Sequence, residues 1–175
     1  GVRISPRMRA VGSSMTLEEY NHSVTLYADR LFRFVAKNVK DRHLAEDIVQ
    51  ESYEKMWKNV AELSADKARA WLFTTAYRAI IDRLRREKRM VASAELPAGI
   101  ETTTHTWSDV RERLSEGVAR LPEIQRIVLT LRDYEGYSYQ EIGEMTTLSE
   151  SQVKVYIYRA RVFLKNYIGK LEVLV

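Results

Sequence analysis

The sequence predicts an all-α protein made of two small helical domains joined by a flexible linker, the C-terminal one a helix-turn-helix. Apolar residues recur at the three- and four-residue spacing of amphipathic helices, and several of these stretches open with a helix-capping pattern. Only seven glycines and three prolines interrupt the 175 residues, so helix breakers are few. Between the two helical stretches, residues 90–109 contain no lysine or arginine, and this change of composition marks the linker.

Composition excludes several classes of protein. The absence of cysteine rules out disulfides and thiolate metal sites, and it is compatible with the reducing cytoplasm, where we expect the protein. His22, His43 and His105 have no metal-ligand spacing, so no metal or other cofactor is expected. No apolar run approaches the roughly 18 residues of a membrane span, so no direct membrane insertion is expected. With no nucleophile–base pair and no glycine-rich phosphate loop, we expect no enzymatic activity.

The change of composition also sets the expected domain boundaries. We expect a disordered leader at 1–15, a first domain at 16–89, an acidic linker at 90–109, a second domain at 110–169 and a tail at 170–175. The only ionised groups of the linker are acidic: Glu95, Glu101 and Asp109. An unstructured connection of this length is uncommon inside one compact domain. The net charge of +4 leans mildly towards a polyanionic partner.

Three helices are expected in the first domain. Thr16 and Glu19 form a capping pattern for the first, which should run to about residue 38. Its apolar stripe is Leu17, Tyr20, Val24, Tyr27, Leu31 and Phe34 (or Val35). Asp41 is the expected cap of the second helix. The apolar face of that helix is Leu44, Ile48, Val49, Tyr53, Met56 and Trp57. A loop at 63–67 should lead into a third helix, from about 66 to 89, with its core side at Phe73, Tyr77, Ile80, Ile81 and Leu84.

The second and third helices carry polar faces of opposite charge. On the second, the acidic and polar residues are Glu46, Asp47, Gln50, Glu51 and Glu54. A carboxylate metal site would need histidines at Glu-x-x-His spacing and a matching helix, so a solvated face or a docking surface for a basic partner helix is favoured. On the third, the far side is Arg78, Asp82, Arg85, Arg86 and Arg89. Asp82 can pair with Arg78 and Arg86 one turn away on either side. Clustered basic side chains anchor phosphates, which favours DNA as their partner.

The second domain ends in a pair of capped helices. Two apolar stripes come first: Val110, Leu114, Val118 and Leu121, then Ile124, Ile127, Val128 and Leu131. Gly136 is an expected left-handed cap. Ser138 with Glu141, and Ser149 with Gln152, then mark two helix starts eleven residues apart.

The longer of these two helices has two distinct faces. Its inward stripe is Val153, Ile157, Ala160 and Leu164, and its outward stripe is Lys154, Tyr158, Arg161 and Lys165. A short capped helix, a turn and a longer helix with a basic face outline a helix-turn-helix DNA reader. A surface helical hairpin with solvated charges is the alternative.

Two long motifs resemble one protein family. The segment AEDIVQES at 45–52, followed by YEKMW and by AWLFTTAYRAIIDRLRREKR, resembles region 2 of the extracytoplasmic-function (group four) sigma factors of bacterial RNA polymerase, within the sigma-70 family. The segment LPEIQRIVLTLRDYEGYSYQEIGEMTTLSESQVKVYIYRARVFLK at 121–165 resembles their region 4. The likeness covers 17–89 and 110–168, in the order that the family has.

The resemblance implies partners and residue roles. Promoter DNA and core polymerase, through its β′ clamp helices and β flap, are the implied partners, together with an anti-sigma factor. The residues implied to dock on the clamp helices are Asp47, Gln50, Glu51 and Glu54. Those facing the minus-ten element are Tyr77, Arg78, Asp82, Arg85, Arg86 and Arg89. Those facing the minus-thirty-five element are Ser151, Gln152, Lys154, Val155, Tyr158, Arg161 and Lys165, the last two suited to phosphates.

Three positions depart from the family pattern. Arg78 stands where the family often has Asn. The T-V-K-x-R of the recognition helix is Q-V-K-V-Y at 152–156, with one basic contact fewer. The family's E-I-A is E-I-G, where Gly143 costs up to about 1 kcal/mol in helix propensity and would allow close approach of another helix.

We therefore expect a sigma factor that directs core RNA polymerase to promoters, recognises the minus-thirty-five and minus-ten elements, and promotes DNA melting. Two alternatives come from other classes. A stand-alone helix-turn-helix repressor would bind a palindromic site as a dimer without polymerase. A helical protein-binding adaptor would have no effect on DNA.

Overall fold

The computed structural model describes residues 14–93 and 110–173, and in these two stretches every regular element is helical, as predicted. The chain divides into two compact units, Gly1–Ile81 and Asp82–Val175. The division falls inside a continuous helix, α3, so the boundaries expected at 89 and 110 remain predictions. Among the described helices, none combines the length and the apolar character that crossing a bilayer requires.

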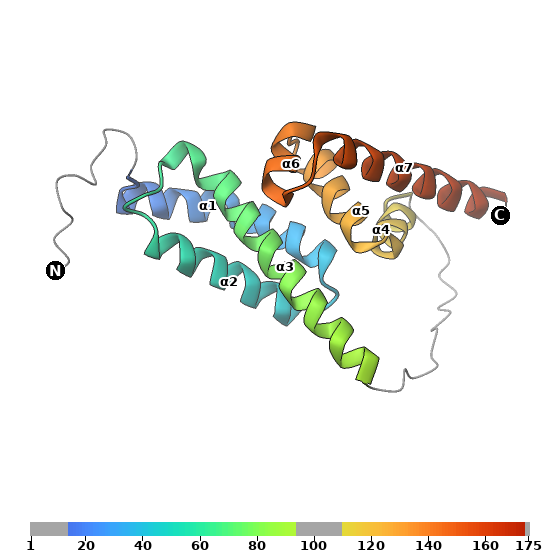
Figure 1. The fold of residues 1–175 in the computed structure, drawn as a ribbon, viewed down its shortest axis with the longest axis horizontal. Helices are drawn as coiled ribbons and strands as arrows, with labels where there is room; N and C mark the ends of the chain where they lie inside the picture. The colour runs from blue at the N-terminus through green and yellow to red at the C-terminus, as the bar shows by residue number, and fades with distance from the viewer. Residues whose placement is uncertain (1–13, 94–109, 174–175) are drawn as a thin grey trace. The chain divides into compact units, whose positions relative to one another are not determined.

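The N-terminal unit, which ends at Ile81, is built on α1 (Leu17–Asn38), α2 (Arg42–Lys58) and the first part of α3 (Ala68–Ser93), whose residues from Asp82 onward belong to the C-terminal unit. Helices α1 and α2 lie side by side, and α3 crosses them (Figure 1). Thr16 closes the predicted capping box at the start of α1. Asp41 is the predicted cap of α2 and accepts hydrogen bonds from two backbone N–H groups there.

The core of this unit forms where the three apolar faces meet. The rings of Phe34 and Phe73 lie 5.4 Å apart, joining α1 to α3. Both are fully buried, and burying a side chain of this size contributes about 1.5–3 kcal/mol. Two residues expected on apolar faces are exposed: Leu17 at 59% and Trp57 at 49%. Leu17 is in the first turn of α1. The large Trp57 ring is only partly covered by Tyr20, whose ring centre is 5.1 Å away.

Three expected boundaries need correction. Met15, placed in the leader at 1–15, is buried, and its N–H donates to the Val60 carbonyl at 2.8 Å. The expected loop at 63–67 contains a 3₁₀ turn, Ala65–Lys67. Helix α3 ends at Ser93, within the expected linker, because no helix breaker occurs before Pro97. The rest of the leader and of the linker lies outside the described residues.

The C-terminal unit contains α4 (Val110–Arg120), α5 (Glu123–Leu129), a π-helical segment (Thr130–Tyr134), α6 (Tyr139–Thr146) and α7 (Glu150–Val173). Helix α7 contacts α4, α5 and α6 (Figure 1). It continues to Val173, so the tail expected at 170–175 is mostly helical. Val110, expected in the stripe of α4, is exposed at the start of that helix.

Two backbone features shape the segment from α5 to α7. Gly136 has a φ of +76°, as its predicted cap role requires. A Cβ atom on Gly143 would lie 2.8 Å from the carbonyl oxygen of Leu148. The glycine in E-I-G does allow a close approach, but the element that approaches is the turn after α6, which folds back against that helix, and not another helix as expected.

Candidate nucleic-acid interface

Helix α7 packs an apolar face against the other helices of its own unit and exposes the opposite face to solvent. The four residues of its predicted inward stripe are all buried: Val153, Ile157, Ala160 and Leu164. The seven residues predicted to face DNA are all exposed: Ser151, Gln152, Lys154, Val155, Tyr158, Arg161 and Lys165. Tyr158 is 69% exposed and Val155 45%. These two side chains give the exposed face an apolar part between its cations.

Each of the two helices in this hairpin, α6 and α7, begins with one capping box. The Ser138 hydroxyl accepts from the Glu141 N–H, and the Glu141 carboxylate accepts from the Ser138 N–H. Ser149 and Gln152 repeat the exchange, at 2.9 and 3.1 Å. The side-chain oxygen of Gln152 is thus used within the cap. Its amide N–H groups remain for an outside acceptor, so Gln152 is better suited to donate than to accept.

A cluster around Tyr139 joins α6, α7 and the π-helical segment. The guanidinium of Arg132 lies 4.6 Å from the centre of the Tyr139 ring, and the Lys154 ammonium lies 5.7 Å from it. Asp133 binds Arg161 at 2.8 Å. This hydrogen bond raises the pKa of Arg161. Sequence reasoning missed Arg132, Asp133 and Tyr139, because the π-helical segment breaks the period that assigns residues to faces.

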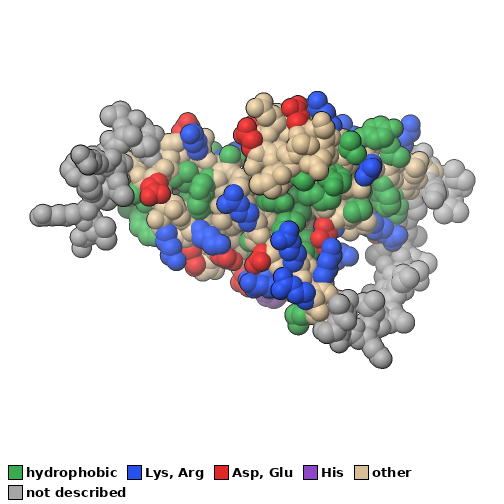
Figure 2. Space-filling view, in the orientation of Figure 1, with side chains coloured by type: hydrophobic (Ala, Val, Ile, Leu, Met, Phe, Trp, Pro, Cys, Tyr) green, Lys and Arg blue, Asp and Glu red, His purple; other side chains and the backbone are tan. Residues whose placement is uncertain are grey.

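The C-terminal half of α3 carries the second cationic face. Figure 2 shows Lys and Arg side chains gathered along this half of the helix. Five of the six residues predicted there are exposed: Arg78, Asp82, Arg85, Arg86 and Arg89. Tyr77 is half-buried, which agrees with its expected place on the core side of the third helix. Of the two pairings that Asp82 could make, the one with Arg86 forms at 3.2 Å. Arg78 has no ion pair with Asp82 among the described residues.

The polar face of α2 is confirmed as a surface. Asp47, Gln50 and Glu54 are exposed and Glu51 is half-buried. Gln50 donates to Glu54 at 3.3 Å, and Glu51 pairs with Lys55 at 3.1 Å. The side chain of Asp47 forms neither contact, and it lies one helical turn before both Gln50 and Glu51. This face is therefore acidic near Asp47, and further along the helix its polar side chains are paired with one another or with Lys55.

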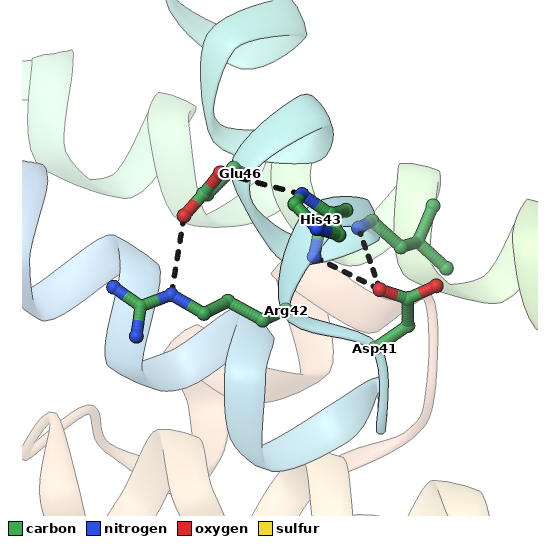
Figure 3. A network of polar contacts seen from close by, with 5 residues as sticks. Asp41, Arg42, His43 and Glu46 are labelled. Carbon is green, nitrogen blue, oxygen red and sulfur yellow. Dashed lines mark hydrogen bonds and ion pairs between the residues drawn. The ribbon is translucent and has the colours of Figure 1, made fainter.

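A separate polar network fixes the start of α2 (Figure 3). Asp41 accepts from the His43 N–H at 2.9 Å and the Leu44 N–H at 3.4 Å. Arg42 pairs with Glu46 at 3.2 Å, and His43 Nδ1 lies 4.0 Å from the same carboxylate. Glu46, which the sequence grouped with the acidic face, thus contacts Arg42 and His43 in the first turn of α2. Across residues 14–93 and 110–173, no group of three potential metal ligands comes together.

These features define a class of protein. An exposed helix that follows a capped helix and a tight turn is the reading element of a helix-turn-helix DNA-binding protein. The family model for Sigma-70 region 2 matches residues 24–90, and that for Sigma-70 region 4 matches residues 111–164. The chain belongs to the extracytoplasmic-function (ECF) sigma factors, and it is a promoter-recognising sigma factor of RNA polymerase.

Relatives from several bacteria share this family. The chain is similar to the ECF RNA polymerase sigma factor SigM of Bacillus subtilis (strain 168), with 29% identity over 157 residues, covering 86% of this chain and 94% of SigM. It is 30% identical over 159 residues to the ECF sigma factor SigK of Mycobacterium bovis (strain BCG / Pasteur 1173P2), covering 85% and 83%. Sigma factor RpoE from Bartonella quintana, solved with the anti-sigma factor NepR, has the same fold, with a TM-score of 0.68, 20% identity and coverage of 87% and 98%.

Proposed function

We propose that this sigma factor divides promoter recognition between the two cationic helix faces. In this proposal α7 reads the minus-thirty-five element as duplex, and α3 captures the minus-ten element and promotes its melting. The observation that carries the proposal is the two-sided character of α7. One stripe is buried to 8% exposure or less, so the opposite stripe is held in a fixed orientation towards solvent.

The composition of the exposed α7 face supports reading of base edges. Ser151, Gln152 and Val155 lie in the first two turns of the helix, the part that a recognition helix inserts into the major groove. The free amide N–H groups of Gln152 can donate to the N7 acceptor of a purine, and apolar groups contact the thymine methyl. Lys154 and Lys165 carry the charge that phosphates attract. This mixture suits sequence-specific contact with duplex DNA.

The α3 face supports a different task. Between Arg78 and Arg89 the chain has six basic and two acidic residues, and this excess of positive charge is concentrated on one half of one helix. A cationic surface that follows the backbone, with aromatic rings nearby, is the arrangement that binds single-stranded nucleic acid. We therefore assign the melted strand to α3 and the duplex to α7.

Core polymerase is the proposed partner of the α2 face. The polar residues Asp47, Gln50, Glu51 and Glu54 suit a basic helix such as the β′ clamp helices, and the β flap is the proposed contact of the C-terminal unit. Docking also raises the affinity for promoter DNA. Two weak DNA-binding modules gain affinity when a third body fixes their spacing, because the second contact becomes intramolecular.

An anti-sigma factor is the proposed regulator, acting in the cytoplasm where the polymerase works. The solved relative RpoE was captured in complex with the anti-sigma factor NepR. The exposed apolar side chains of α7, including Val155, Tyr158 and Val162, offer such a partner surface to cover. A partner bound there would compete with DNA for the same helix.

In vitro transcription with purified core polymerase tests the proposal. With this chain added, the polymerase is expected to initiate at defined start sites on promoters that carry both elements, and to lose initiation when either element is scrambled. Initiation that ignores the minus-ten element while depending on the other would contradict the role given to α3.

A further inference from the structure

One acidic residue of the C-terminal unit lies against the cationic face of α7. Asp133 Oδ1 accepts a hydrogen bond from Arg161 Nη2 at 2.8 Å, across 28 positions of sequence. Both side chains of the ion pair are about half exposed. Arg161 is therefore held at the surface by a residue of another element, the π-helical segment.

A second cation of α7, Lys154, is restrained in a similar way. Lys154 Nζ lies 3.4 Å from Glu150 Oε1 and 5.7 Å from the centre of the Tyr139 ring. Lys154 and Arg161 are two helical turns apart, so both lie on the same side of α7. Each of these two α7 cations is therefore matched by one carboxylate.

Such pairing changes how the face interacts with DNA. A cation that neutralises a phosphate releases condensed counterions, which adds about 0.9 to the slope of affinity against salt. A carboxylate beside the cation repels the same phosphate and cancels most of that attraction. Arg161 can therefore make a full phosphate contact only after it leaves Asp133.

We propose that Asp133 is a specificity-determining residue, which holds Arg161 and thereby reduces the sequence-independent attraction of α7 to DNA phosphates. The inference rests on the proposed function, because it matters only if this face meets duplex DNA. Phosphate contacts carry no sequence information, whereas base-edge contacts do. When the phosphate contacts are weakened, discrimination between DNA sequences depends on base-edge contacts from residues at the front of α7, such as Gln152 and Val155.

The test is the variant D133N, which removes the charge and keeps the shape of the side chain. Binding of the full chain to a non-promoter duplex is measured by fluorescence anisotropy between 50 and 200 mM salt. We expect the slope of log affinity against log salt to steepen by about 0.9, which is about 3.5-fold in affinity across this fourfold range of salt. The ratio of promoter to non-promoter affinity should fall.

Two further variants make the result specific to the ion pair. Glu144 is exposed on α6 and has no ion-pair partner within the described residues, so E144Q removes an equal charge from the same unit. It should leave the slope unchanged. The double variant D133N/R161A should lose the gain of D133N, because the released guanidinium is absent. Thermal unfolding followed by circular dichroism shows that each variant is folded.

The possible outcomes separate this inference from the proposed function. A D133N slope equal to that of E144Q overturns the inference, and so does weaker duplex binding by D133N, which would mean that Asp133 positions Arg161 for contact. In either case the wild-type chain would still direct start-site-specific transcription with core polymerase. Failure of the wild-type chain to do so overturns the proposed function instead.

Discussion

The cationic faces of α3 and α7 have the same spacing but different electrostatics. Each carries polar and charged residues at intervals of four, three and four along a helix. On α3, Arg86 is paired with Asp82 of its own helix and Lys88 with Glu123 of α5, and the basic residues of this half of the helix still outnumber the acidic ones. On α7 the two cations nearest Tyr139 each have a carboxylate partner, and one of these, Asp133, comes from another element.

This difference shows that a basic stripe in a sequence does not by itself measure affinity for DNA. The α3 face has an excess of positive charge, which suits a flexible DNA single strand that must be held along its backbone. On the α7 face Lys154 and Arg161 are each paired with a carboxylate, and Val155 and Tyr158 are exposed beside them, which suits contact with base edges. The predictions that follow test whether the two faces differ in this way.

The largest effect is expected when the polymerase no longer places both faces on DNA. Replacing Asp47 and Gln50 together by arginine puts like charges against a basic partner helix, which costs several kcal/mol. Affinity for core polymerase should fall more than 100-fold in a pull-down or anisotropy assay. Binding of the free chain to duplex DNA should not fall. Unchanged affinity for core would refute the docking assignment of α2.

The next largest effect is expected from α3. The double variant R85A/R89A removes two cations one helical turn apart. Each charged hydrogen bond lost is worth about 1.5 kcal/mol, so open-complex formation should drop on the order of 100-fold, measured by permanganate reactivity of the minus-ten thymines. Core affinity is the control and should be preserved. Open complexes at wild-type levels would remove α3 from the melting step.

On α7, loss of an apolar contact should affect specificity more than general affinity. Y158A removes an exposed ring from the middle of the reading face. Promoter duplex affinity should fall about tenfold, or about 1.4 kcal/mol, with little change for non-promoter duplex. Equal losses on both kinds of DNA would show that Tyr158 contacts the backbone and carries no specificity.

Lys154 should have a smaller effect, and its effect should depend on salt. K154A removes one cation, so the salt slope for the promoter duplex should fall by at most about 0.9, and the footprint over the upstream element should weaken. Because Glu150 already pairs with Lys154, the change should be smaller than that for R85A in single-strand binding. A larger slope change for K154A than for R85A would reverse the comparison of the two faces.

The smallest effect concerns the turn that positions α7. Thr147 has a φ of 59°, a conformation that costs an L-residue about 1–2 kcal/mol. Glycine relieves this strain but is more flexible when unfolded, so T147G should stabilise the unit by about 0.5 kcal/mol in thermal unfolding. The matched control T25G, in the interior of α1, should instead destabilise, by about 0.3 kcal/mol from helix propensity. A loss of stability in T147G would mean that the Thr147 hydroxyl, which donates to Thr146 O at 2.6 Å, matters more than the strain.

Much of this structure follows from local patterns in the sequence. The capping boxes at Thr16, Ser138 and Ser149, the Asp41 cap and the buried stripe of α7 were all predictable, because each depends on residues within one or two helical turns. The left-handed Gly136 and the close approach at Gly143 were predictable for the same reason.

The rest depends on contacts that no local pattern records. The Asp133–Arg161 pair joins residues 28 positions apart, across a π-helical segment that shifts the helical period. The exposure of Trp57 depends on how much of its ring Tyr20 covers, and the burial of Met15 depends on a backbone bond to Val60. The roles of the α2, α3 and α7 faces came from the family likeness, and they stay predictions at the level of single residues.

Transcription from a pre-melted promoter tests the division between the two faces most directly. The holoenzyme is assayed on a duplex promoter and on the same promoter with an unpaired bubble at the minus-ten element, for wild type, R85A/R89A and Y158A. If α3 opens the duplex and α7 reads it, the bubble should restore most of the activity of R85A/R89A and leave the defect of Y158A in place. Equal rescue of both variants, or of neither, would contradict the account.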